Sequence, residues 1–158
     1  MIIEMNITER ELVIASGNRG KIKEFRNFLQ PFPFQISAQP DDVVVEETGK
    51  TFLENARLKA LAISEITGKW ALADDSGLCV DALAGAPGLY SARYGENDSE
   101  RISCLLAEMQ GIENRKAIFH ASICIVTPLK KVVIEVEGIS RGLITRKARG
   151  TAGFGYDP

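Results

Sequence analysis

The stretch "ELVIASGNRGKIKEF", residues 11–25, joins a short apolar run to a glycine-containing turn and a helical pattern. Residues 12–15 predict a buried strand, because a short continuous apolar run next to a turn is typical of one. Residues 21–29 predict a helix, which Pro31 and Pro33 end. A turn that leads from a strand into a helix N-terminus presents backbone N–H groups to an anion. The stretch therefore predicts an α/β fold with an anion site at the turn.

The rest of the chain alternates strand and helix patterns. Thr51 and Glu54 form a predicted capping box at the start of a long helix, and Gly68 ends it. A further helix is expected over residues 99–110, and Pro128 marks a hairpin turn between two long β runs. Extended chain is predicted for residues 34–38, 70–73, 78–83, 116–128 and 131–144. This order predicts an α/β domain with a mixed sheet.

Size and composition are those of one soluble domain. The chain has 158 residues, of which 45% are hydrophobic and 25% charged, and the net charge is −2. This charge argues against binding to a nucleic-acid polymer, which requires a basic face. No run approaches the roughly 20 apolar residues of a membrane span, and residues 1–10, "MIIEMNITER", do not read as a signal peptide.

The cysteines and the histidine are predicted to be structural. The three cysteines, Cys79, Cys104 and Cys124, are odd in number and form no C-x-x-C pair. A reduced, cytoplasmic protein is the simplest interpretation. The single histidine, His120, lies in a predicted strand and has no second histidine with which to share a metal.

The turn after the first strand carries the features of a phosphate site. Gly17 and Asn18 tolerate a tight backbone, and Ser16 adds a hydroxyl group. A lysine at a helix start is unfavourable for the helix dipole, so Lys21 is better explained by a nearby anion. The alternative is an ordinary capped helix with a solvated lysine. The spacing differs from that of a Walker loop.

Two acidic segments predict a divalent-metal site. Asp74 and Asp75 are expected to end an apolar strand, and because side chains alternate along a strand only one of them faces a given pocket. Glu46 or Glu47 is the candidate for a second carboxylate. Mg²⁺ usually takes one or two protein carboxylates and completes its shell with water and substrate phosphate. The alternatives are an Asx-turn at the aspartates and a solvated acidic loop at the glutamates.

A second lysine extends the predicted anion site. Asn55 and Lys59 lie four residues apart on one helix face, from which Lys59 could reach the phosphates. Together, the phosphate turn, the lysines and the carboxylates predict a metal-dependent enzyme acting on phosphate anhydrides. No Ser–His–Asp set is expected, because the single histidine lies in a strand.

Four stretches, in this order, resemble the Ham1/RdgB family of inosine triphosphate pyrophosphatases: "ASGNRGKIKEF", "EETGKTFLENARLKA", "ADDSGLCVDALAGAPGLYSARYG" and "GTAGFGYDP". The resemblance implies an elongated α/β domain of two lobes with a central cleft. It implies hydrolysis of ITP, dITP and XTP to the monophosphate and pyrophosphate, with Mg²⁺ as cofactor. It also implies a homodimer.

The resemblance implies roles for individual residues. The triphosphate is assigned to the turn that comprises Ser16, Gly17, Asn18, Arg19, Gly20 and Lys21. Lys59 would also bind the triphosphate, and Ser76 would contact the substrate. Glu46 and Asp75 would bind Mg²⁺, and Asp75 would also be the proton acceptor. Part of the nucleoside pocket would be formed by Phe154, Gly155, Tyr156 and Asp157, with Phe154 stacking on the base.

Two alternatives remain beside this interpretation. Members of the family continue past "GFGYDP" with a lysine and a Ser-His-Arg motif, so residues 1–158 are expected to be a single, C-terminally incomplete pyrophosphatase domain. The first alternative is therefore a form that binds nucleotide but is impaired in catalysis. The second is a Maf-like pyrophosphatase. That class begins with a Ser-x-x-Arg-Arg loop, where this chain has Asn18 and Lys21.

Overall fold

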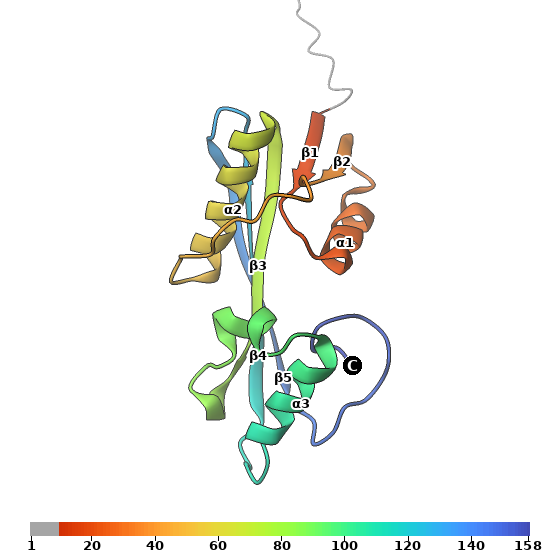
Figure 1. The fold of residues 1–158 in the computed structure, drawn as a ribbon, viewed down its shortest axis with the longest axis vertical. Coiled ribbons are helices and arrows are strands. Elements are labelled where there is room, and N and C mark those ends of the chain that lie inside the picture. The colour runs from red at the N-terminus through yellow and green to blue at the C-terminus, as the bar shows by residue number, and fades with distance from the viewer. Residues whose placement is uncertain (1–9) are drawn as a thin grey trace, which may run out of the picture. The chain divides into compact units, whose positions relative to one another are not determined.

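The computed structural model describes residues 10–158. The segment 1–9, in which the sequence predicts no signal peptide, lies outside the described residues. Five strands and three α-helices follow one another as β1 (Arg10–Ile14), α1 (Arg19–Leu29), β2 (Phe34–Ala38), α2 (Phe52–Thr67), β3 (Trp70–Val80), α3 (Asp98–Glu108), β4 (Lys116–Val126) and β5 (Val132–Leu143). Two short 3₁₀ helices, η1 (Asp81–Leu83) and η2 (Gly88–Arg93), lie between β3 and α3 (Figure 1).

The strands form one mixed sheet with the order β2-β1-β3-β4-β5. β1 is parallel to both β2 and β3, with Ile14 opposite Ala38 on one side and Leu72 on the other. A tight turn in which Thr127 and Lys131 are hydrogen-bonded joins β4 to β5, so this neighbouring pair is antiparallel. The prediction of an α/β fold with a mixed sheet is confirmed.

The chain divides into two compact units. The first takes the chain up to Asp74 together with residues 123–136, and the second takes residues 75–122 and 137–158. The boundary falls inside β3, between Asp74 and Asp75. Each unit has its own hydrophobic core.

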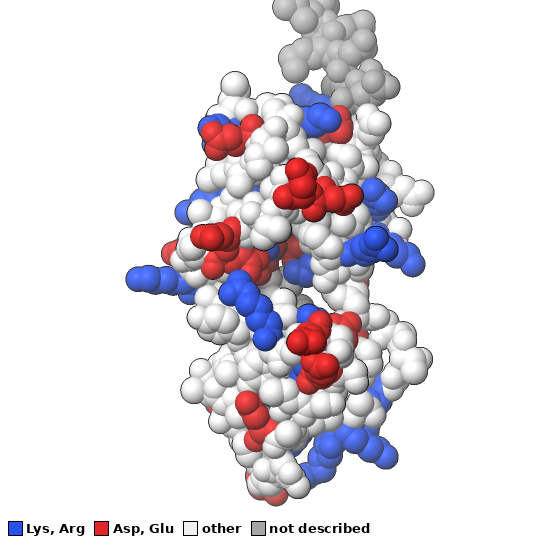
Figure 2. All heavy atoms as spheres, viewed as in Figure 1, with Lys and Arg blue, Asp and Glu red and all other residues white. Residues whose placement is uncertain are grey.

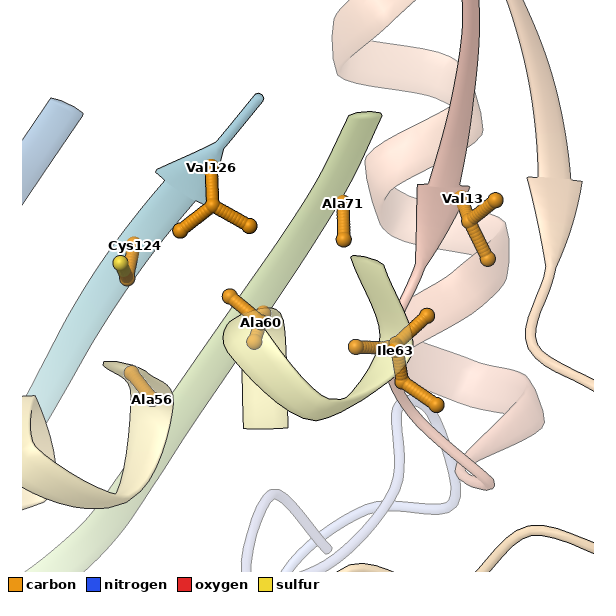
Figure 3. Packing of buried hydrophobic residues seen from close by; sticks show 9 residues of the cluster. Val13, Ala56, Ala60, Ile63, Ala71, Cys124 and Val126 are labelled. Carbon is orange, nitrogen blue, oxygen red and sulfur yellow. The ribbon is translucent and has the colours of Figure 1, made fainter. Parts of the chain in front are cut away.

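The first core lies between α2 and one face of the sheet in unit 1. Along α2, Ile63 lies beside Val13 of β1 and Ala56 lies toward Cys124 of β4, with Ala60 between them (Figure 3). Ala71 of β3 belongs to the same cluster. Small side chains on α2 allow the helix backbone to approach the strands closely. This packing holds α2, which carries the predicted site residue Lys59.

α1 covers the opposite face of the sheet in unit 1. Ile22, Phe25 and Leu29, spaced three and four residues apart, pack against Leu12 and Ile14 of β1. Unit 1 is therefore a three-layer α/β/α arrangement (Figure 1). Because β1 leads directly into α1, the turn between them is held at both ends.

Unit 2 has a smaller core around α3. Leu105 of α3 and Met109, which directly follows the helix, pack with Leu78 and Val80 of β3, and Tyr156 lies against the same cluster. The segment from residue 144 to residue 158 contains neither helix nor strand. Its packing comes from individual side chains such as that of Tyr156.

The elements depart from the predictions at several places. Residues 81–83, predicted to be extended, form the 3₁₀ helix η1, and α3 ends at Glu108, two residues earlier than expected. α1 begins at Arg19, two residues earlier than expected, because Asn18 acts as its N-cap. β3 does not end at the aspartates but continues to Val80. Thr51 and Gly68 do bound α2 as predicted, with Gly68 in the left-handed conformation at φ 67°.

The surface carries charges of both signs. In Figure 2, Lys and Arg side chains are interspersed with Asp and Glu side chains over the face in view. Within residues 10–158, no helix combines the length and the apolar character that a membrane crossing requires.

Candidate functional site

The turn at residues 16–21 is held by its own side chains. Asn18 Oδ1 accepts hydrogen bonds from the backbone N–H groups of Gly20, at 2.8 Å, and Lys21, at 3.2 Å. Ser16 Oγ accepts a hydrogen bond from the Asn18 N–H at 3.1 Å. Several of the N–H groups predicted to face an anion are thus satisfied within the turn. Asn18 is a helix cap as well as a turn residue.

A hollow of about 610 Å³ borders this turn. Ser16, Gly17 and Arg19 form one side of it, and Lys23 and Arg26 extend it along α1. Arg19, Lys23 and Arg26 are spaced four and three residues apart, so they share one face of the helix. The surroundings of the turn are therefore rich in cationic side chains.

Lys21 lies against a buried carboxylate. Its Nζ is 2.5 Å from Asp74 Oδ2, and the side chains of Lys21 and Asp74 are 20% and 7% exposed. The sequence predicted a bound phosphate near Lys21; in this structure the group that contacts Lys21 Nζ is the carboxylate of Asp74. The pairing follows from the sheet, because β1 and β3 are parallel with Ile14 opposite Leu72, two residues before Asp74.

The second predicted lysine also contacts a carboxylate. Lys59 Nζ lies 2.8 Å from Glu47 Oε1, whereas Glu46 is exposed. One turn earlier on α2, the buried Asn55 accepts a hydrogen bond from the Gly49 N–H at 2.7 Å. The expectation that Asn55 and Lys59 share a face is therefore confirmed, and both side chains hold the acidic loop that precedes α2.

The two aspartates of β3 have different surroundings. Both are buried, and Asp75 Oδ1 accepts a hydrogen bond from the Ser76 N–H at 3.1 Å. Because β3 continues through them, their side chains leave opposite faces of the strand. Asp74 is the one that faces Lys21. Among the residues described, no group of three or more His, Cys, Asp or Glu side chains is arranged to hold a metal ion.

The segment 153–157 forms a closed turn. The Phe154 N–H donates to Asp157 Oδ2 at 3.3 Å, and the Asp157 N–H donates to the Phe154 carbonyl at 3.2 Å. Gly153 has a φ of +81°, and a Cβ there would lie 2.2 Å from Asp157 Oδ2. Asp157 therefore shapes the turn.

Two residues that the sequence analysis did not single out anchor this turn. Asp98 Oδ2 accepts a hydrogen bond from the Gly155 N–H at 2.8 Å, and the Tyr156 hydroxyl donates to the Ser91 carbonyl at 2.9 Å. Burial raises the pKa of Tyr156 to about 12, which keeps the phenol protonated and able to donate. No local pattern signals these contacts, since they join segments 57 and 65 residues apart.

Comparison with known proteins identifies the family. Residues 12–158 match the model of the Ham1 family. The chain belongs to the Ham1 family. It is 60% identical over 152 residues to a dITP/XTP pyrophosphatase of Prochlorococcus marinus (strain MIT 9313), covering 96% of this chain and 75% of that protein. A dITP/XTP pyrophosphatase of Synechococcus sp. (strain CC9311) is also 60% identical, with 96% and 74% of the two chains covered.

Solved structures agree with the Ham1 assignment. A HAM1 protein from Coxiella burnetii matches with a TM-score of 0.83 and 39% identity, covering 94% of this chain and 79% of that one. The Ham1 protein of Staphylococcus aureus matches with a TM-score of 0.79 and 41% identity over 94% and 79% of the two chains. The Ham1 family match includes the turn at 16–21, the acidic loop, β3 and the turn at 153–157.

Proposed function

We propose that this Ham1-family chain hydrolyses non-canonical purine nucleoside triphosphates, namely dITP, XTP and ITP, to the monophosphate and pyrophosphate. The observation that carries the proposal is the 60% identity, over 96% of the chain, to a protein named dITP/XTP pyrophosphatase. The local geometry of unit 1 supports it. A capped helix N-terminus, Lys21 and a hollow lined by Arg19, Lys23 and Arg26 together suit a polyanion.

The triphosphate is assigned to the turn at residues 16–21 and to Lys59. Lys21 and Lys59 supply two positive charges, which stabilise the negative charge that develops on the leaving pyrophosphate. Without ligand these charges are balanced by Asp74 and Glu47. A phosphate group that arrives at either lysine therefore shares or replaces a carboxylate contact. Each ammonium group is held in place before the substrate binds.

The cofactor of this proposal is Mg²⁺, with Glu46 and Asp75 as its protein ligands. Carboxylate oxygens are the donors that Mg²⁺ prefers, and two protein ligands are enough when phosphate oxygens complete the shell. When bound, Mg²⁺ neutralises charge on the phosphates.

The remaining roles concern the water and the base. Asp75 accepts the proton of the water that attacks the α-phosphorus, and Ser76 contacts the substrate. Phe154 stacks on the purine, with Gly155, Tyr156 and Asp157 completing that part of the pocket. The proposal also includes a cytoplasmic location and a homodimer. Light scattering tests the homodimer by looking for the mass of two 17.3 kDa chains.

The decisive experiment measures pyrophosphate release from dITP, XTP and ATP with and without Mg²⁺. Pyrophosphate, and not orthophosphate, is expected from dITP and XTP. Binding of dITP without pyrophosphate release would favour the alternative of a catalytically impaired nucleotide-binding protein.

Mutation of the carboxylates tests the residue roles. Asp75→Asn should abolish turnover and leave the fold intact, because it removes a charge but little volume. Glu46→Gln should mainly raise the Mg²⁺ concentration needed for half-maximal activity. Asp81→Asn is a matched control, because Asp81 is exposed and lies just after β3. Near-normal hydrolysis by Asp75→Asn would remove Asp75 from the mechanism.

A further inference from the structure

The turn at residues 153–157 is tied to the rest of unit 2 at two points. It belongs to a segment with neither helix nor strand. The Gly155 N–H nevertheless donates to Asp98 Oδ2 at 2.8 Å, and the Tyr156 hydroxyl donates to the Ser91 carbonyl at 2.9 Å. The two anchored residues directly follow Phe154 and so restrict where its ring can lie.

The first anchor, Asp98, is itself fixed. Asp98 is the first residue of α3, where a negative charge is favoured by the helix dipole. Its Oδ1 accepts a hydrogen bond from Arg101 Nη1 at 2.6 Å, and Arg101 Nε donates to the Gly95 carbonyl at 3.1 Å. One oxygen of the carboxylate is thus held by α3, and the other is directed at Gly155. A charged acceptor makes this contact stronger than a neutral hydrogen bond.

The second anchor links the turn to β3. Ser91 is buried, and its Oγ accepts a hydrogen bond from the Leu78 N–H at 2.9 Å and donates one to the Gly88 carbonyl at 2.6 Å. Leu78 lies two residues after Ser76 on β3. A chain of hydrogen bonds therefore connects the strand that carries Ser76 to the phenol of Tyr156.

We propose that Asp98 and Ser91 are positioning residues, which hold the 153–157 turn so that Phe154 meets the purine base. This inference rests on the proposed function, in which Phe154 stacks on the base. In this proposal neither residue contacts the substrate. Their effect is exerted through the backbone of Gly155 and the hydroxyl of Tyr156.

The test replaces the acceptor on Asp98 and follows the turn directly. Asp98→Ala should speed amide hydrogen exchange at Gly155 by about tenfold or more, because a protecting hydrogen bond is lost. The same variant should raise KM for XTP by about tenfold, with a smaller change in kcat. Inhibition by inorganic tripolyphosphate should be unchanged, since the phosphates are assigned to the turn at residues 16–21.

Two further variants separate positioning from helix stability. Asp98→Asn keeps a single, uncharged oxygen acceptor, which can serve the Gly155 N–H or Arg101 but not both. It should therefore fall between the wild type and Asp98→Ala in exchange and in KM. Asn97→Ala removes the α3 cap, in which Asn97 Oδ1 accepts from the Glu100 N–H at 3.0 Å, without touching the turn. It should lower stability and leave Gly155 exchange and KM for XTP unchanged.

The outcomes distinguish this inference from the proposed function. Unchanged Gly155 exchange in Asp98→Ala would overturn the anchoring role, whatever the enzyme activity. Faster exchange with unchanged KM would overturn the link between the turn and the base. An inactive wild-type chain would overturn the proposed function, and the exchange experiment would still decide whether Asp98 holds the turn.

Discussion

Replacement of Lys21 by alanine should destabilise unit 1. A lysine at a helix start is usually solvated, and its loss then changes stability by no more than about 0.5 kcal/mol. Here Lys21 Nζ lies 2.5 Å from Asp74 Oδ2, and the carboxylate belongs to a side chain that is only 7% exposed. The substitution therefore removes the cation closest to a buried negative charge.

The size of the effect follows from the burial of the two partners. Removal of one partner costs about 3–5 kcal/mol in a fully buried pair and about 0–1 kcal/mol at the surface. Because the Lys21 side chain is 20% exposed, the pair is not fully buried. We therefore expect the free energy of unfolding to fall by about 2–3 kcal/mol. The double variant Lys21→Ala/Asp74→Asn should lose about 1–2 kcal/mol less than the sum of the single variants, since the buried charge is removed as well.

Urea unfolding followed by tryptophan fluorescence measures this loss. Trp70 is the single tryptophan of the chain and packs in unit 1, so the signal reports on the unit concerned. Lys69→Ala is the matched control, because Lys69 pairs with Glu11 at 2.7 Å in a setting where the side chains are 44% and 30% exposed. If Lys21→Ala lost no more stability than Lys69→Ala, the argument from burial would be refuted.

Two further predictions concern the acidic loop and the turn near the chain end. Gly49→Ala should lower the free energy of unfolding by about 1–3 kcal/mol, because its Cβ would lie 2.6 Å from Asn55 Oδ1; an unchanged melting temperature would contradict this. Burial raises the pKa of Tyr156 to about 12, whereas an unfolded tyrosine has a pKa of about 10. The contribution of the protonated phenol to the free energy of unfolding is therefore complete below about pH 10 and is lost as the pH rises toward 12. Urea unfolding from pH 8 to 11.5 should therefore show a steeper alkaline loss for the wild type than for Tyr156→Phe, and parallel curves would show that the phenol is not buried.

The parts of the fold that the sequence predicted depend on local signals. The apolar run at residues 12–15, the cap at Thr51 and the left-handed Gly68 each act within a few residues, and the structure confirms them. The continuation of β3 through Asp74 and Asp75 was missed, because aspartate is unfavourable in strands on average. Lys21 of α1 pairs with Asp74 and offsets this cost. The residues next to Asp74 in the sequence give no sign of that pairing.

The contacts of the candidate site likewise divide into those that local spacing predicts and those that join distant segments. Lys59 and Asn55 could be placed on one face of a helix from their spacing alone. The contact of Lys21 with Asp74 spans 53 residues, and that of Gly155 with Asp98 spans 57. The first of these follows once β1 and β3 are known to be parallel neighbours. The second depends on an irregular segment for which no pairing rule exists.

Three buried polar residues occupy places where apolar side chains could pack, and each of them holds another segment of the chain in position. Asn55, Asp74 and Ser91 are 2%, 6% and 6% exposed, and buried polar contacts are often no more stabilising than well-packed apolar side chains in place of both partners. Each of the three is hydrogen-bonded to a group in a different segment: the Gly49 N–H, the Lys21 ammonium group and the Leu78 N–H. The apolar cores in Figure 3 and around α3 already account for packing. The buried polar groups are therefore best explained by the segments they hold, namely the acidic loop, the start of α1 and the link from β3 to the 153–157 turn.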